Sequence, residues 1–193
     1  MEKKDLQIIA QNLANPQGEK GIEIGEMMNH TNIGMTLESI QKLLIEDDEH
    51  ILEIGHGNAD HVKSILNKAI NIKYTGIDIS ETMHQEAIRQ NAAFEDQAGF
   101  VLYEGKKLPF QDKTFDKIFT VNTIYFWQEP EKLLSEIYRV LKPEGTFCIT
   151  FSEESFMKQL PFTQFEFNLY STEKAERLIE KTAFQVVHKE TLT

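Results

Sequence analysis

The amino-acid sequence predicts an α/β protein built on a doubly wound, mostly parallel sheet with helices on both faces. Two observations carry this prediction. From residue 50 onward, short apolar segments alternate with segments of helical periodicity, a pattern typical of repeated strand–helix–strand units. The first apolar segment also ends in two glycines, Gly55 and Gly57, where the chain is expected to turn from strand to helix.

The first 45 residues are expected to be helical. Leu6, Ile9 and Leu13 recur at helical spacing, and the Pro- and Gly-containing segment 15–18 then breaks the pattern. A further apolar stripe around Ile40 indicates a second helix before the acidic run that precedes the first strand.

Five strands and three helices are expected in the middle of the chain. The strands fall at residues 50–54, 72–79, 99–103, 115–121 and 145–151, and the helices at 59–69, 81–91 and 130–141. Pro130 suits the first turn of a helix. Pro143 and Gly145 then end that helix before the fifth strand.

The remaining residues are less regular but continue the same domain. Aromatic residues are dense between 156 and 170, a helix with a Ser/Thr start is expected over 171–181, and a closing strand is expected over 184–187. No repeat, low-complexity segment or linker interrupts the chain, so residues 1–193 are expected to form a single domain.

The composition disfavours several classes of function. A net charge of -11 argues against nucleic acid or an anionic membrane as the main partner, because both select basic surfaces. The single Cys148 lies in a strand-like segment, and no Cys/His spacing suggests a metal site. No apolar run approaches the ~20 residues of a membrane-spanning helix. With no signal-peptide core either, the cytoplasm is the expected compartment.

Glycines or polar residues stand where four of the expected strands end, at Glu53–Gly57, Asp78, Glu104 and Asn122. Ligands of open parallel sheets bind beyond these carboxyl ends. Asp78 lies about twenty residues past the glycines, where an acid can accept both hydroxyls of a ribose. Asp60 takes the place of the third glycine of a dinucleotide-binding loop, and an acid there would repel a pyrophosphate. A ligand with a positive centre is therefore favoured.

The segment Glu53–Ala59 resembles motif I of the class I S-adenosylmethionine-dependent methyltransferases, with Ala59 in place of the last glycine. Residues 104–116 look like the family's stretch around the third and fourth strands. Residues 131–145 are similar to its helix and turn before the fifth strand. In this order and spacing, the segments most resemble the small ubiquinone- and menaquinone-biosynthesis-like methyltransferases, which act on small molecules.

The resemblance implies a Rossmann-like fold with S-adenosylmethionine as the cofactor. The implied cofactor-binding residues are Glu53, Gly55, His56, Gly57, Asp78, Ile79, Glu104, Gly105 and Asn122. Asp78 would hold the ribose, and Ile79 and Glu104 would lie at the adenine. Asn122 would lie under the cofactor, and the side chain of His56 is expected to face the cofactor edge or the solvent.

The resemblance also implies how the chain is divided and what it acts on. Residues 1–45 would form a helical lid, residues 50–151 the cofactor-binding core, and residues 152–193 an aromatic segment, a helix and the last strand. The expected acceptor is a small, partly apolar molecule. His30 in the lid and Tyr125 in the aromatic run after the fourth strand are the candidate catalytic residues.

Departures from the family pattern leave alternatives open. Ala59 and Glu104 differ from the motifs, and only six residues follow the expected strand at 184–187. That is too few for the family's final antiparallel strand, so we expect a shortened chain or an unusual sheet edge. Such an edge makes a homodimer an alternative to a monomer. The alternative functions are a module that binds the cofactor without transferring a methyl group and a nicotinamide-dependent oxidoreductase.

Overall fold

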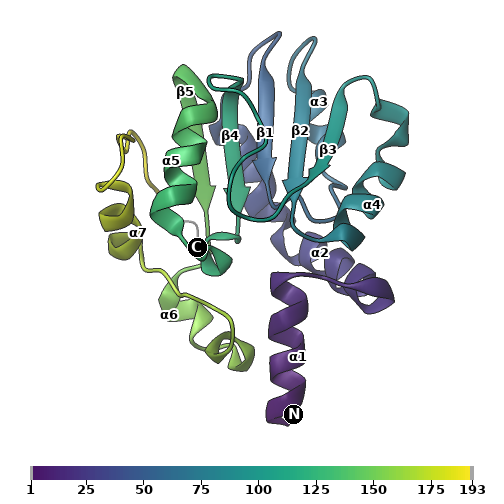
Figure 1. Ribbon diagram of the computed structural model, residues 1–193, viewed down its shortest axis with the longest axis vertical. Helices are drawn as coiled ribbons and strands as arrows, with labels where there is room; N and C mark the ends of the chain where they lie inside the picture. The colour runs from purple at the N-terminus through teal and green to yellow at the C-terminus, as the bar shows by residue number, and fades with distance from the viewer. Residues whose placement is uncertain (1, 192–193) are drawn as a thin grey trace.

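A computed structural model describes residues 2–191 and confirms the α/β fold (Figure 1). Within these residues, five strands form one parallel sheet in the order β3-β2-β1-β4-β5. The strands are β1 (His50–Ile54), β2 (Lys73–Asp78), β3 (Ala98–Leu102), β4 (Phe115–Val121) and β5 (Leu141–Thr150). The strand order reverses between β1 and β4, so a ligand cleft is expected beyond the carboxyl ends of these two strands.

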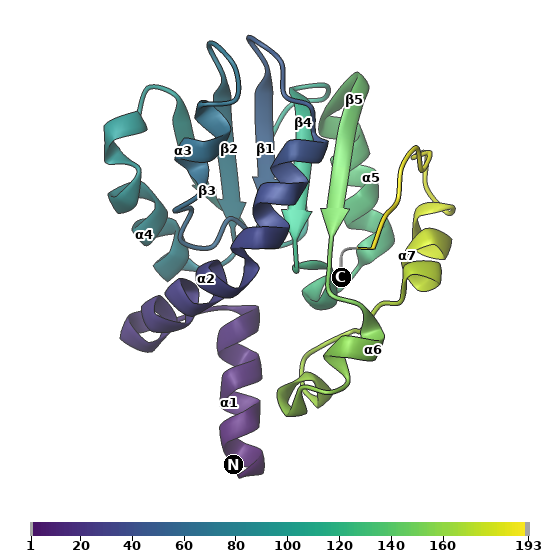
Figure 2. The ribbon, with the colours of Figure 1, turned by 180° about the vertical axis from the view of Figure 1, so that it is seen from behind.

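Helices cover both faces of the sheet (Figures 1 and 2). They are α1 (Lys3–Ala14), α2 (Gly18–Lys42), α3 (Val62–Leu66), α4 (Glu81–Gln90), α5 (Pro130–Val140), α6 (Glu154–Met157) and α7 (Thr172–Ile179), with 3-10 turns η1 (Ala92–Phe94), η2 (Ile124–Phe126) and η3 (Pro161–Gln164). Helices α2, α3 and α4 pack on one face, and α5 and α7 on the other. None of the described helices has the length and apolar character to cross a membrane.

The alternation of side chains along β1 explains why the sheet is buried on both faces. Ile51 packs with α2, α3 and α4, whereas Leu52 and Ile54 pack with α5 and α7. The same alternation places Ile118 and Phe119 of β4 in opposite layers. A parallel sheet covered in this way has nearly continuous apolar strands, which is the pattern that the sequence displays.

The lid expected at residues 1–45 consists of α1 and α2. Figures 1 and 2 show α1 below the carboxyl ends of the strands, on the same side as α6. The turn between α1 and α2 is fixed to the start of α4: the Ser80 hydroxyl donates to the Pro16 carbonyl at 2.5 Å, and the Gly18 N–H donates to Thr82 Oγ1 at 3.0 Å. The turn between α1 and α2 is therefore anchored next to the residue that ends β2.

The strand expected at residues 184–187 is wrong, because this segment lies outside the sheet. The Phe184 ring packs against Tyr138 of α5 at 5.3 Å and against Phe147 of β5 at 5.4 Å, between ring centroids. These side-chain contacts hold the segment near β5 without extending the ladder. β5 is therefore an edge strand of the described sheet, and the homodimer stays a prediction. Residues 1, 192 and 193 of the expected domain lie outside the described residues.

The helix expected over residues 59–69 is also shorter than predicted. The regular part is α3, at Val62–Leu66, because Ala59 adopts a left-handed conformation with φ of 56°. Glycine favours this conformation and other residues are strained in it. The position where the family motif has its last glycine therefore keeps a glycine-like backbone with alanine in place.

Two glycines in neighbouring strands, Gly76 of β2 and Gly99 of β3, differ in the space around them. A Cβ on Gly76 would lie 2.7 Å from His56 Cδ2 and 2.9 Å from the Tyr74 hydroxyl oxygen, whereas a Cβ on Gly99 would meet no atom within 4 Å. Gly76→Ala should lower the free energy of unfolding by about 1–3 kcal/mol through overpacking, and Gly99→Ala by less than about 0.5 kcal/mol. Urea titration measures both values. Equal losses would contradict the packing described here.

Candidate active site

The loop after β1 is shaped by two glycines at the point where the strand order reverses. Gly55 and Gly57 have φ of 77° and 57°, in the left-handed region. A Cβ on Gly55 would overlap the side chain of Thr123, which follows β4. The Gly55 N–H donates to the Ile77 carbonyl at 2.7 Å. The loop is therefore pressed against both neighbouring strand ends, and only glycine fits at residue 55.

Asp78 ends β2 and is bonded to two parts of the site. Its Oδ2 accepts the Gly57 N–H at 3.0 Å, and its Oδ1 accepts the Ser80 N–H at 2.8 Å. The side chain is buried, with 8% of the residue exposed. Each carboxylate oxygen has a second lone pair, so Asp78 can hold the loop and still accept hydroxyl donors.

The residues expected at the adenine follow the ends of β2 and β3. Ile79 follows Asp78 and is 40% exposed, an unusual exposure for isoleucine. Gly105 has φ of 75°, and a Cβ there would approach Ile79 Cγ2 to 3.3 Å. Glu104 is exposed beyond the end of β3. Ile79 and Gly105 are thus brought together, and Ile79 presents an open apolar surface.

Glu53 is buried beneath the glycine loop and bonded to two side chains that sequence analysis missed. Its Oε2 accepts hydrogen bonds from the Tyr74 hydroxyl at 2.5 Å and from His61 Nε2 at 2.7 Å. Burial alone would lower the pKa of His61, but the Glu53 carboxylate raises it above its usual value. Burial, reinforced by Glu53, raises the pKa of Tyr74. Glu53 therefore fastens β1 to β2 and to the start of α3.

The side chain of His56 is buried, so the solvent-facing orientation, one of the two that were expected, is wrong. It is 3% exposed, and its ring packs edge-on against Phe100 with centroids 5.1 Å apart. The absence of a side chain on Gly76 makes room for it. Nδ1 bonds to the Gly57 carbonyl at 2.7 Å. Burial lowers the pKa of His56. The neutral ring therefore packs beneath the Gly55–Gly57 loop and holds its backbone in place.

Asn122 lies at the end of β4 and is held by hydrogen bonds from three directions. Its Oδ1 accepts from the Tyr125 hydroxyl at 3.0 Å and from the Ser152 N–H at 3.0 Å. Its Nδ2 donates to Asn32 Oδ1 of α2 at 3.1 Å. The backbone φ of Asn122 is 56°, an uncommon conformation for a residue other than glycine. The end of β4, helix α2 and the segment after β5 therefore meet at this side chain.

The two candidate catalytic residues differ in their surroundings. Tyr125 is 1% exposed, and its hydroxyl bonds to Asn122 and to the Ser152 backbone. Burial raises the pKa of Tyr125 to about 12, so the phenol stays protonated at neutral pH and is a poor general base. His30 lies exposed on α2. The structure therefore gives Tyr125 a supporting role and brings His30 into no hydrogen bond within the described residues.

A cavity of about 540 Å³ opens between the lid turn, the end of β2, η2 and the segment after η3. Its lining residues are Ala14, Asn15, Ile79, Tyr125, Phe126, Gln128, Glu166, Phe167 and Asn168. Phe126 and Phe167 pack edge to face with centroids 4.7 Å apart. The wall is therefore aromatic with an amide-rich rim, and the lining contains one acid and no base.

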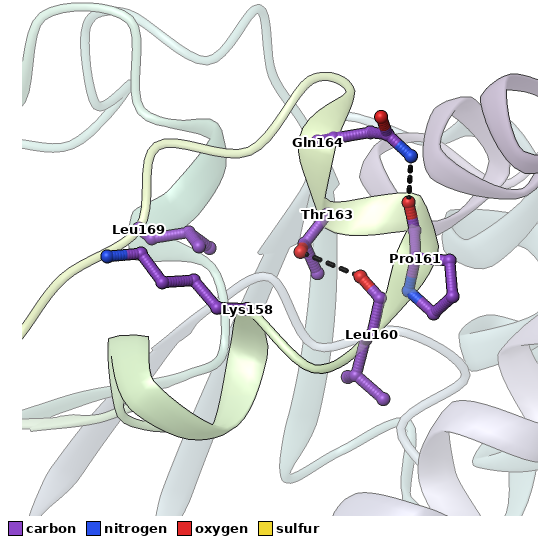
Figure 3. A pocket seen from close by; sticks show the side chains of 6 residues that line it. All are labelled: Lys158, Leu160, Pro161, Thr163, Gln164 and Leu169. Carbon is purple, nitrogen blue, oxygen red and sulfur yellow. Dashed lines mark hydrogen bonds between the residues drawn. The ribbon is translucent and has the colours of Figure 1, made fainter.

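A second hollow of about 320 Å³ lies between α6 and η3 (Figure 3). Thr163 Oγ1 donates to the Leu160 carbonyl at 2.9 Å, and the Gln164 amide donates to the Pro161 carbonyl at 2.7 Å. Lys158 pairs with Glu154 at 2.7 Å. These polar groups close the turn on itself, and none of the strand-end residues lines the hollow. The larger cavity is therefore the candidate site.

Comparisons with known proteins agree with this geometry. The family described as a methyltransferase domain matches residues 52–149. YrhH of Bacillus subtilis, named as a methyltransferase, is 31% identical over 132 residues, which are 67% of this chain and 71% of that protein. Demethylmenaquinone methyltransferase of Symbiobacterium thermophilum is 34% identical over 63% of this chain and 49% of its own length. A crystal structure of a SAM-dependent methyltransferase from Aquifex aeolicus shares the fold, with a TM-score of 0.71, 22% identity, and coverage of 86% and 89%.

The Glu53–His61 pair predicts a specific pH dependence of stability. The pKa of His61 is raised in the folded state, so the pair contributes fully below the unfolded pKa of about 6.5 and loses its contribution as the pH rises through the folded pKa. The unfolding free energy lost in His61→Gln should therefore shrink as the pH rises above about 6.5, measured by urea titration. A loss that is constant or grows with pH would contradict a charged pair.

Proposed function

Because this chain belongs to the class I S-adenosylmethionine-dependent methyltransferase family, we propose that it transfers the cofactor's methyl group to a small, partly apolar acceptor that carries no negative charge. Family membership gives the reaction class and the cofactor, and it removes the oxidoreductase alternative. The observation that carries the acceptor class is the cavity beside Ile79, whose wall is aromatic and whose lining holds no Lys, Arg or His.

The residues at the strand ends fit the cofactor in shape and charge. The carboxylate of Asp78 has unused acceptor capacity for the ribose hydroxyls. Ile79 offers an exposed apolar surface for the adenine, and Gly105 beside it leaves the approach open. The left-handed glycines Gly55 and Gly57 would pass beside the methionine part. We assign these residues, together with Asn122, to the cofactor site.

Glu53 and His56 belong to the same site as supports. Glu53 is bonded to Tyr74 and His61, and His56 is buried against Phe100. Neither side chain needs to touch the cofactor to affect its binding, because both hold the loop from below. Glu104 is exposed after the end of β3. Its side chain could rotate to contact the adenine amino group.

For methyl transfer, the main task of the protein is to align the acceptor with the methyl group. When bound, S-adenosylmethionine supplies an electrophilic methyl group on a sulfonium. Holding an acceptor in line with that group lowers the barrier by several kcal/mol or more, and a general base is needed only where the acceptor must lose a proton. The aromatic side chains of Tyr125, Phe126 and Phe167 would orient a flat or apolar acceptor.

The charge pattern of the cavity argues against an anionic acceptor. Glu166 is the ionisable lining residue apart from the buried Tyr125, and the chain as a whole carries a net charge of -11. An anionic acceptor would lose hydration without gaining a cationic partner. Asn15, Gln128 and Asn168 instead provide amide donors and acceptors for neutral polar groups.

Asp78 provides the first test of this assignment. Asp78→Ala should weaken the binding of S-adenosylmethionine and of its demethylated product by about tenfold or more, since hydrogen bonds to a charged group are worth ~1.5–3 kcal/mol. Isothermal titration calorimetry measures the change. Asp116→Ala is the matched control: it removes an ion pair with Lys142 at 2.7 Å near the amino ends of the strands and should leave affinity unchanged. Equal affinities of the Asp78→Ala variant and the wild type would show that the ribose assignment is wrong.

The acceptor class is tested with a panel of matched aromatic acceptors that differ only in charge. Release of S-adenosylhomocysteine should be faster with uncharged phenols or alcohols than with their carboxylated analogues. Phe167→Ala should raise KM for an accepted compound about tenfold, because the acceptor loses an aromatic contact. A tenfold change corresponds to about 1.4 kcal/mol, less than the ~3–5 kcal/mol lost when a fully packed Phe is truncated. Phe156→Ala, at a residue that is 53% exposed and outside the cavity lining, is the control. A preference for carboxylated acceptors would refute the proposed class, and no transfer to any compound would favour a binding module.

A further inference from the structure

We propose that Asn32 of helix α2 is a positioning residue for the cofactor site that acts through Asn122. The inference rests on the proposed assignment of Asn122 to the cofactor site. Asn32 is half-buried, and its Oδ1 accepts a hydrogen bond from Asn122 Nδ2 at 3.1 Å. No motif in the sequence singles out Asn32, which lies ninety residues from its partner.

The hydrogen bonds of Asn122 leave its amide a single orientation. Oδ1 accepts from the Ser152 N–H and from the Tyr125 hydroxyl. A flipped amide would turn its NH2 group toward the Ser152 N–H and its oxygen toward Asn32 Oδ1, opposing donor to donor and acceptor to acceptor. Asn32 thus supplies the oxygen acceptor for the remaining side of Asn122, next to a weaker sulfur acceptor, Met35 Sδ of the same helix, at 3.5 Å.

The place of Asn122 makes this orientation matter for the cofactor site. It follows β4, which lies next to β1 at the reversal of strand order. The next residue, Thr123, packs against Gly55, and its hydroxyl bonds to Thr120 Oγ1 at 2.5 Å. Thr120 in turn donates to the Ile54 carbonyl at 2.7 Å. A shift of Asn122 would therefore reach the glycine loop that faces the methionine part of the cofactor.

Helix α2 touches the core in more than one place, which provides a matched comparison. One turn before Asn32, the Asn29 amide donates to Asp60 Oδ2 at 3.2 Å in an exposed position. Both bonds dock the same helix through the same type of side chain. Only the bond of Asn32 ends on a strand-end residue of the site. If α2 served merely as a cover, the two bonds would have similar effects on cofactor binding.

A double-mutant cycle on the full chain tests the inference, with S-adenosylhomocysteine as the probe and calorimetric Kd as the readout. Asn32→Ala should weaken binding about three- to tenfold, as expected for one lost hydrogen bond. In an Asn122→Ala background, the same substitution should change Kd by less than about twofold, because its route of action is gone. Asn32→Asp keeps an acceptor for Asn122 Nδ2 and should restore Kd to within about twofold of wild type.

The outcomes separate this inference from the proposed function. Asn29→Ala should leave Kd unchanged, and thermal denaturation should show all the single variants folded. Equal effects of Asn29→Ala and Asn32→Ala, or an Asn32→Ala effect that persists undiminished without Asn122, would overturn the positioning role while leaving the cofactor site intact. A wild-type chain that does not bind the probe would overturn the proposed site itself and this inference with it.

Discussion

The carboxylate of Asp78 is the interaction on which the arrangement of the site depends. One oxygen holds the Gly57 N–H of the loop after β1, and the other holds the Ser80 N–H at the start of α4. Ser80 then donates its hydroxyl to Pro16 in the lid turn. A single buried acid therefore connects the glycine loop, the end of β2 and the lid. Ligand hydroxyls received by Asp78 would join the same set of bonds.

The second buried acid of the site has a different task. Glu53 shares one oxygen between Tyr74 and His61 beneath the loop, so its charge is balanced inside the protein. A buried carboxylate without a partner destabilises the folded state, so removing either partner of Glu53 should lower the free energy of unfolding. The two acids therefore differ in their partners: Glu53 is bonded to the side chains of Tyr74 and His61, whereas Asp78 is bonded to the backbone of Gly57 and Ser80.

Sequence patterns predicted those parts of the fold that depend on local periodicity. The strands around Glu53, Asp78 and Val121, and the helix that begins at Pro130, fall close to their expected positions, because apolar alternation and helix-start signals are local. The strand at 184–187 failed because aromatic packing of Phe184 replaces backbone pairing. The roles of Asn32, His61 and Tyr74 could not be predicted from local patterns, because they arise from contacts between different segments of the chain. The direction of the His56 ring depended on Gly76 across the sheet.

The central claim is that the strand ends around Asp78 and Asn122 form the cofactor site. A crystal structure of the chain with S-adenosylhomocysteine tests it most directly. The ribose hydroxyls should lie within hydrogen-bond distance of Asp78, the adenine against Ile79, and the methionine end between the Gly55 loop and Asn122. A nucleoside bound elsewhere, with Asp78 still bonded only to Gly57 and Ser80, would contradict it.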